Sequence, residues 1–105
     1  MGEIMANNSR MTTFYTNCLV EDIRNGLFDD YGKLTSLQLE YTVPFNRNKH
    51  VDVYVETDKM SIAIEVKKGK YDFKTRCGEN FIGDINFFCV PSELVGFAIR
   101  YIAEN

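Results

Sequence analysis

Two neighbouring runs of alternating residues constrain the fold of this chain more than any other feature. In each run β-branched residues occupy every second position, the period of a β-strand: Val51, Val53 and Val55 in residues 50–57, and Ile62, Ile64 and Val66 in residues 61–67. Only three residues, 58–60, separate the runs. Because a connection this short suits a hairpin, the two runs predict an antiparallel pair of strands.

The register of this hairpin decides which polar side chains meet. With a two-residue turn at Asp58 and Lys59, Asp52 lies directly opposite Glu65 on the same face. A four-residue turn would set Asp52 opposite Lys67 instead. Opposed residues have Cβ atoms about 4.5–5.5 Å apart, and like charges there are destabilising. The first register therefore predicts a carboxylate pair whose repulsion a cation would relieve.

Other elements flank the hairpin. An apolar stripe at helical spacing predicts a helix over residues 9–28: Met11, Phe14, Tyr15, Cys18, Leu19 and Ile23. Alternation predicts a strand over residues 35–43, and residues 86–90 form a short apolar strand. A short helix is expected near Asp72, and another opens at Pro91 and Ser92. The order predicts an α/β or α+β fold in one domain, residues 1–105, with helices flanking a small mixed β-sheet.

Composition excludes several classes of protein. No apolar run approaches the roughly 18–20 residues that cross a bilayer, and the first residues lack the pattern of a signal peptide, so we expect a cytoplasmic protein that does not contact a membrane. Three cysteines without a C-x-x-C pair suggest neither a disulfide framework nor a zinc site. Cys18 and Cys89 are expected in the core. A lone histidine, His50, leaves no catalytic triad or His-rich metal site.

The carboxylate pair is the strongest candidate for chemistry. Magnesium or manganese is typically held by one or two carboxylates, with water and phosphate completing its shell. Lys67 lies two residues beyond Glu65 on the same face, where its ammonium could stabilise a phosphate transition state. This arrangement indicates phosphodiester hydrolysis. The alternative is that Glu65 and Lys67 form a surface ion pair worth under ~1 kcal/mol.

Charge is unevenly distributed along the chain. The net charge is −3, but residues 67–76 carry five basic residues and one acidic residue, a net +4, which leaves −7 elsewhere. Six basic residues are expected around the carboxylates, where they would bind phosphate or simply form a solvated rim: Arg47, Lys49, Lys68, Lys70, Lys74 and Arg76. Among them Tyr71 and Phe73 are candidates for stacking on bases, although Phe73 also fits the core. Without a base-reading helix, little sequence specificity is expected.

Asp52, followed after twelve residues by Glu65, Val66 and Lys67, resembles the core of the PD-(D/E)XK nuclease superfamily. The segments VDVYVE, IAIEVKKGKYDF and GDINFFCVP are similar to the MmcB-type DNA-repair family within it, over residues 37–94. The resemblance implies a restriction-endonuclease-like αβββαβ core and a magnesium-dependent nuclease. Asp52, Glu65 and the main-chain carbonyl of Val66 would hold the metal, and Lys67 would be the catalytic lysine.

The match has departures and leaves alternatives. Val51 stands where the superfamily's name has Pro, and a Lys-Trp pair of the MmcB type is missing because the chain has no Trp. The superfamily's acidic residue from the first helix would be Glu21 or Asp22, neither of which we assign. The leading hypothesis is a metal-dependent nuclease or nuclease-like DNA-processing protein, with a homodimer expected because so small a domain covers only part of a duplex. The alternatives are a catalytically silent module of the same fold that binds nucleic acid or a protein, and a plain interaction domain.

Overall fold

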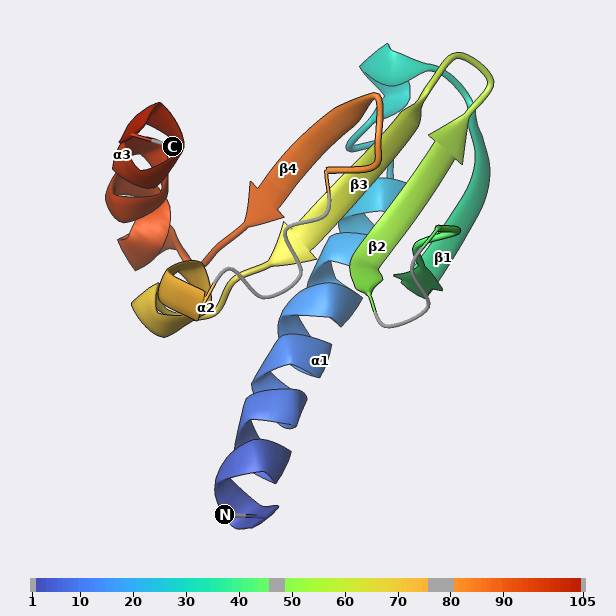
Figure 1. The fold of residues 1–105 in the computed structure, drawn as a ribbon. Helices are drawn as coiled ribbons and strands as arrows, with labels where there is room; N and C mark the ends of the chain where they lie inside the picture. Colours follow the sequence, from blue (N-terminus) through green and yellow to red (C-terminus); the bar gives the residue numbers. More distant parts are fainter. Residues whose placement is uncertain (1, 46–48, 76–80, 105) are drawn as a thin grey trace.

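A four-stranded mixed sheet forms the centre of the molecule (Figure 1). The computed structural model describes the backbone of residues 2–45, 49–75 and 81–104, and the side chains of residues 13–45, 49–74 and 81–104. The strands lie side by side in chain order: β1 (Leu34–Thr42), β2 (His50–Thr57), β3 (Ser61–Val66) and β4 (Ile85–Cys89). The first three are antiparallel, whereas β4 is parallel to β3. The predicted α+β fold with a small mixed sheet is confirmed.

The β2–β3 hairpin has the register predicted for a two-residue turn. Val53 pairs with Ile64, and Tyr54 pairs with Ala63. At the turn, the Thr57 N–H donates to the Met60 carbonyl at 2.9 Å. This register brings the start of β2 next to the end of β3, and we call this edge of the sheet the carboxylate end.

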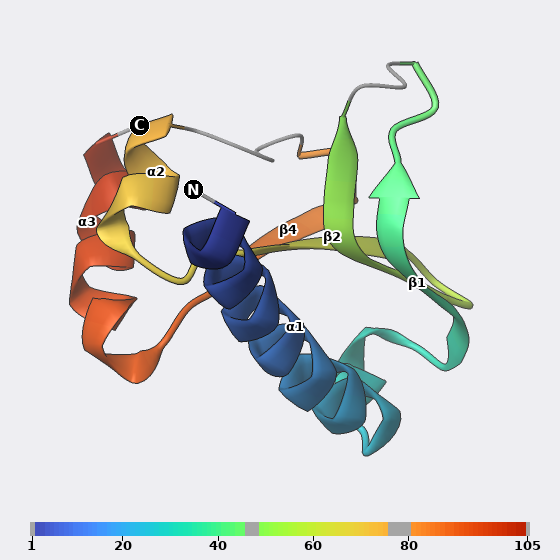
Figure 2. The same cartoon turned by 90° about the horizontal axis from the view of Figure 1, so that it is seen from below.

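The described residues form three α-helices, one across a face of the sheet and two beyond one side of it (Figures 1 and 2). α1 (Gly2–Arg24) crosses one face, where Leu19 and Ile23 pack against apolar side chains of β2 and β3. α2 (Lys70–Thr75) connects β3 to β4, and the 3-10 turn η2 (Ser92–Leu94) leads into α3 (Val95–Glu104). α2 and α3 lie together beyond the β4 side of the sheet (Figures 1 and 2). No helix in the described part of the chain is long and apolar enough to cross a membrane.

The first helix ends at Arg24, four residues before the predicted end at Phe28. Gly26 has φ +109°, a left-handed conformation that glycine adopts at little cost. The Gly26 N–H donates to the Ile23 carbonyl, and the Leu27 N–H donates to the Asp22 carbonyl. These two bonds form a Schellman motif that stops the helix. The short 3-10 helix η1 (Asp29–Tyr31) then leads toward β1.

The predicted apolar stripe of the first helix is only partly buried. Leu19 and Ile23 are in the core, but Phe14 is 63% exposed and Cys18 is exposed as well, so the expectation of a buried Cys18 is wrong. Cys89, by contrast, is half-buried against the core. The buried face of the helix is formed by Thr16, Leu19 and Ile23, which are three and four residues apart, so Phe14 and Cys18 lie on other sides of the helix. The N-terminal half of α1 extends beyond the sheet (Figure 1).

The close approach of Gly83 to β3 gives a test of this packing. A Cβ at Gly83 would lie 2.6 Å from both the Ala63 nitrogen and the Ile85 carbonyl oxygen, two backbone atoms that cannot move aside. Gly83→Ala is therefore expected to lower the free energy of unfolding by about 1–3 kcal/mol, measured by urea denaturation. Gly96 in α3 has open space around it, so Gly96→Ala should stabilise by about 0.5–1 kcal/mol. Equal effects of the two substitutions would contradict the packing.

Candidate metal and nucleic-acid site

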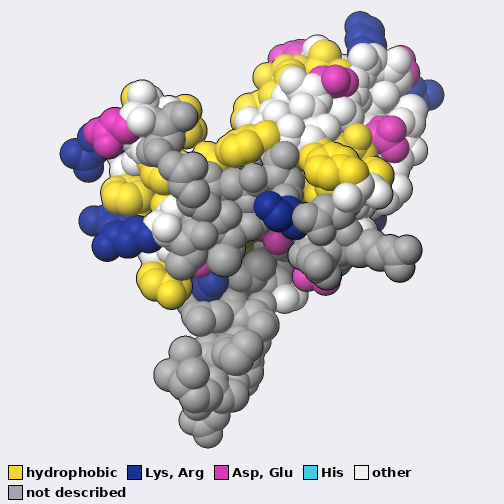
Figure 3. Space-filling view, in the orientation of Figure 1, with side chains coloured by type: hydrophobic (Ala, Val, Ile, Leu, Met, Phe, Trp, Pro, Cys, Tyr) yellow, Lys and Arg dark blue, Asp and Glu magenta, His cyan; other side chains and the backbone are white. Residues whose placement is uncertain are grey.

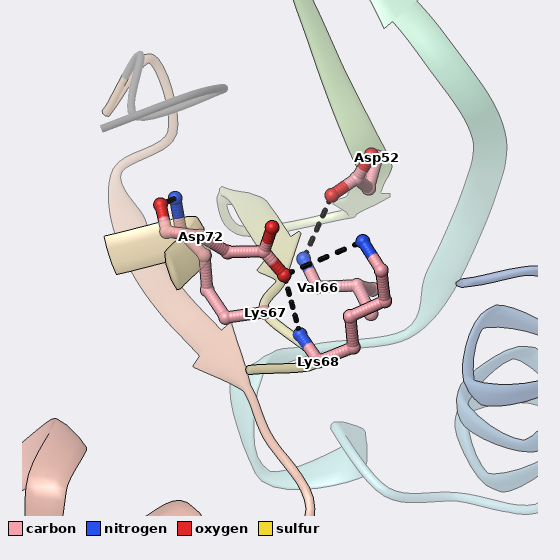
Figure 4. A network of polar contacts seen from close by, with 5 residues as sticks. All are labelled: Asp52, Val66, Lys67, Lys68 and Asp72. Atoms are coloured by element: carbon pink, nitrogen blue, oxygen red, sulfur yellow. Dashed lines mark hydrogen bonds and ion pairs between the residues drawn. The ribbon is translucent and has the colours of Figure 1, made fainter. Parts of the chain in front are cut away.

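Asp52 lies where the pairing of β2 with β3 ends. The backbone pairing of β2 with β3 ends at Val53 and Ile64. Beyond this pair a side chain joins the two strands, because Asp52 Oδ2 accepts a hydrogen bond from the Val66 N–H at 2.7 Å (Figure 4). Val51 packs with Val43 and Ala63, whereas Val53 packs against α1. The regular alternation of β2 is therefore broken at Asp52, which turns its carboxylate toward the end of β3.

Glu65 lies next to Asp52, as the predicted register requires. Its side chain is only 6% exposed, and its carboxyl group hydrogen-bonds with Asp52. The pKa of Asp52 is raised above its usual value, chiefly because burial penalises the charged form. Hydrogen bonds from Val66 and with Glu65 lower it, and the negative charge of Glu40 raises it further. The two carboxyl groups thus form a desolvated pair at the carboxylate end.

Lys67 is turned away from this pair. Its side chain is 1% exposed, and its Nζ donates to the Asp72 carbonyl at 3.1 Å. The same ammonium lies 5.6 Å from the centre of the Phe73 ring and 5.7 Å from that of Phe88. Figure 4 shows the side chain extending toward α2, on the side away from Asp52. Its charge still lowers the pKa of Asp52, although this is the smallest of the causes acting on that group.

A groove beside Asp52 brings in residues that the sequence did not single out. It holds about 340 Å³ and is lined by Thr13, Thr16 and Asn17 of α1, Leu39 and Glu40 of β1, and Asp52. Glu40 has φ +48°, a conformation that costs a residue other than glycine on the order of 1–3 kcal/mol. The β1–β2 pairing skips Glu40 and Asp52, although the pairs on either side would set them opposite each other.

Sequence reasoning missed Glu40 because the connection from β1 to β2 is too long to fix a register. Residues 43–49 separate these strands, so no turn type determines which residues face each other. The two acidic candidates from the first helix, Glu21 and Asp22, are both exposed and are not among the residues lining the groove. The side chains that α1 does supply there are neutral hydroxyl and amide groups.

The predicted basic rim is partly described. Lys49, Lys70 and Lys74 are exposed, and Lys68 forms an ion pair with Asp72 at 3.5 Å. The Lys70 Nζ lies 5.4 Å from the centre of the Phe97 ring. Arg47 and Arg76 lie outside the described residues. Basic side chains gather on the side of the molecule formed by α2 and α3 (Figure 3).

Comparison with family models, curated proteins and solved structures gave no match to this chain. The candidate site therefore stands on its own geometry. Within the described residues, no group of three or more His, Cys, Asp and Glu side chains gathers in a way that would hold a metal ion. Asp52 and Glu65 are hydrogen-bonded to each other, and Glu40 lines the groove together with Asp52.

The raised pKa of Asp52 gives a pH-dependent test. Because the folded state holds this proton more tightly than the unfolded chain, the stability that Asp52 contributes is complete at low pH and is lost as pH rises through the folded pKa. Asp52→Asn is neutral throughout and can still accept from Val66. We therefore expect the free energy of unfolding of the variant, minus that of the native chain, to be larger at pH 7 than at pH 3. Both free energies are measured by urea denaturation. Asp30→Asn, at an exposed position in η1, is the control. If that difference is instead smaller at pH 7 than at pH 3, ionised Asp52 stabilises the fold and the expectation is wrong.

The burial of Lys67 predicts a large structural effect of truncating it. Lys67→Ala removes a buried four-carbon stem and an ammonium that lies over the rings of Phe73 and Phe88, and should cost about 2–4 kcal/mol of unfolding free energy. Lys67→Met keeps most of the stem and should cost less. The neighbouring Lys68→Ala, which breaks only a partly exposed ion pair, should cost under about 1 kcal/mol. Similar denaturation midpoints for Lys67→Ala and Lys68→Ala would contradict this assignment.

Proposed function

We propose that this protein is a metal-dependent nuclease, or a nuclease-like DNA-processing or repair protein, with little sequence specificity. The observation that carries the proposal is the desolvated pair Asp52 and Glu65, held on adjacent strands at one end of the sheet. Lysines lie on both sides of this pair, because Lys49 precedes β2 and Lys70 and Lys74 belong to α2. The resemblance to the PD-(D/E)XK superfamily, and to its MmcB-type family, supports the same activity.

The donor set fits magnesium or manganese. Both ions prefer oxygen ligands, and magnesium is commonly held by one or two carboxylates together with water and substrate phosphate. Asp52 and Glu65 would supply carboxylates and Val66 its main-chain carbonyl. Burial raises the pKa of Asp52, so a cation at this position would offset a real desolvation cost. When bound, such an ion stabilises the charge that builds on a phosphate as a P–O bond breaks.

The chain's own residues position the site. The Val66 N–H holds the Asp52 carboxylate at 2.7 Å, which fixes its direction without neutralising it. The exposed lysines would bind the phosphates on either side of the reacting one. In this proposal, Lys67 acts on the phosphate after its ammonium leaves the Asp72 carbonyl and turns toward Asp52.

One observation favours a second function. The Lys67 ammonium already has a carbonyl acceptor and two aromatic rings, so in this conformation it serves packing rather than catalysis. A catalytically silent module that binds nucleic acid or a protein through the same end of the sheet would need no lysine at the carboxylates. The two functions differ in whether phosphodiester bonds are broken.

The test is a cleavage assay with Mg²⁺ or Mn²⁺ on single-stranded, duplex and branched DNA. We expect metal-dependent cleavage by the native chain, and a loss of about 100-fold or more in Asp52→Asn, Glu65→Gln and Lys67→Met. The control is Glu56→Gln, which changes an exposed carboxylate outside the site on β2, the strand that also carries Asp52. This variant should cleave DNA like the native chain.

Each outcome separates the two functions. If the native chain cleaves none of the substrates with either metal but still binds DNA, the silent module is supported and the nuclease proposal is wrong. Cleavage that survives in Asp52→Asn and Glu65→Gln would show that the activity lies elsewhere. Mg²⁺ titration by calorimetry provides an independent check, because Asp52→Asn should weaken metal binding even where no cleavage is detected.

A further inference from the structure

Two aromatic side chains near the candidate site are unusually exposed. Phe45 is 80% exposed and Tyr71 is 74% exposed, the highest values among the large apolar side chains described. By contrast Phe73, two residues after Tyr71, is 1% exposed and packs against Phe88, Phe97 and Tyr101. The structure therefore separates the two aromatic residues of this segment into one that belongs to the core and one that faces solvent.

Both exposed rings lie at the carboxylate end of the sheet. Phe45 is in the connection from β1 to β2, which is closed by a hydrogen bond from the Val43 N–H to the Lys49 carbonyl at 3.0 Å. Tyr71 is in α2, directly after β3. Since β2 begins where β3 ends, these two segments leave the sheet at the same end as Asp52 and Glu65. The β1–β2 connection lies on the β1 side of the sheet and α2 on the β4 side (Figure 1).

Each ring has exposed cationic neighbours. Lys49 follows Phe45 in the same connection, while Lys70 precedes Tyr71 and Lys74 follows it by three positions, on the same side of the helix. Lysines that attract phosphate beside rings that can stack on bases are the combination found in proteins that bind single strands.

We propose that the carboxylate end binds single-stranded nucleic acid, with bases stacking on Phe45 and Tyr71 and phosphates contacting Lys49, Lys70 and Lys74. This inference rests on the proposed function, which supplies the reaction, and it adds the class of nucleic acid that is bound. In a duplex the faces of the bases are already stacked on one another, so rings on the protein surface have no base to contact. Rings exposed to this extent therefore favour unpaired strands over intact duplex.

Binding can be measured without cleavage, in EDTA, by fluorescence anisotropy of labelled strands of about 15 nucleotides. The probes are oligo(dT), oligo(rU), a duplex of the same length and an abasic strand. The native chain should bind the single strands more tightly than the duplex, and Phe45→Ala and Tyr71→Ala should each weaken binding about 5- to 150-fold. The two single-strand probes distinguish DNA from RNA as the source of the unpaired bases.

Matched variants separate stacking from general effects. Tyr71→Phe keeps the ring and should bind like the native chain. Leu27→Ala removes an exposed apolar side chain from the segment before β1, at the opposite end of the sheet, and should also bind normally. The abasic strand should bind weakly and should be insensitive to Phe45→Ala and Tyr71→Ala. The double variant Lys70→Ala/Lys74→Ala should reduce the salt dependence of binding, whereas the aromatic variants should not.

The inference is overturned if the duplex binds more tightly than both single strands, or if Phe45→Ala and Tyr71→Ala bind oligo(dT) and oligo(rU) like the native chain. Failure of the nuclease proposal has a different signature. If binding depends on the rings but no cleavage occurs, the single-strand inference is supported and the nuclease proposal is wrong. If the chain cleaves duplex with metal and neither ring substitution affects this, the nuclease proposal is supported and the single-strand inference is wrong.

Discussion

The turn at Asp58 and Lys59 is the constraint on which the position of the candidate site depends. Thr57 Oγ1 accepts hydrogen bonds from the Lys59 and Met60 N–H groups, so the turn is closed by a side chain as well as by the backbone. The Asp58 carboxylate accepts from the Lys33 N–H at 2.8 Å, which ties the turn to the start of β1. A Cβ at Gly32 would lie 2.6 Å from Asp58 Oδ1. Because slipping the register by one residue exchanges the two faces of a strand, this tightly packed turn decides that Asp52 meets Glu65 at the far end.

The end of β3 carries charges that stability alone does not explain. β3 lies between β2 and β4, and Glu65 and Lys67 are both buried there. Buried charges are costly unless they are hydrogen-bonded, and replacing them with apolar residues is often neutral or stabilising. The Lys67 ammonium is compensated by a carbonyl and two rings, whereas the neighbour of Glu65 is a second carboxyl group, that of Asp52. Ionisable groups concentrated in this way, beside a groove and with a perturbed carboxylate, are typical of functional sites.

The parts of the structure that the sequence predicted are those determined by local rules. Alternation over residues 50–57 and 61–67 and a three-residue gap are enough to predict a hairpin, but they leave two registers open. The structure has the register of the two-residue turn, which brings Asp52 to Glu65. The direction of Lys67 follows instead from the packing of α2, which brings the Asp72 carbonyl and Phe73 to its ammonium. The exposure of Cys18 depends on which side of α1 faces the sheet, since its neighbours Thr16 and Leu19 are both buried. Helical spacing identifies an apolar stripe, but tertiary packing decides which residues of that stripe are buried against the sheet.

The strand order has a consequence for how the chain reaches this structure. Each strand pairs only with its neighbours in the sequence, so the antiparallel meander β1–β2–β3 closes short loops, while joining β4 to β3 in parallel requires the longer crossover through α2. Loop-closure entropy therefore favours early formation of the meander and late docking of β4. Folding should then proceed from the hairpin toward the β4 edge. The carboxylates would be brought together before Lys67 acquires its aromatic neighbours.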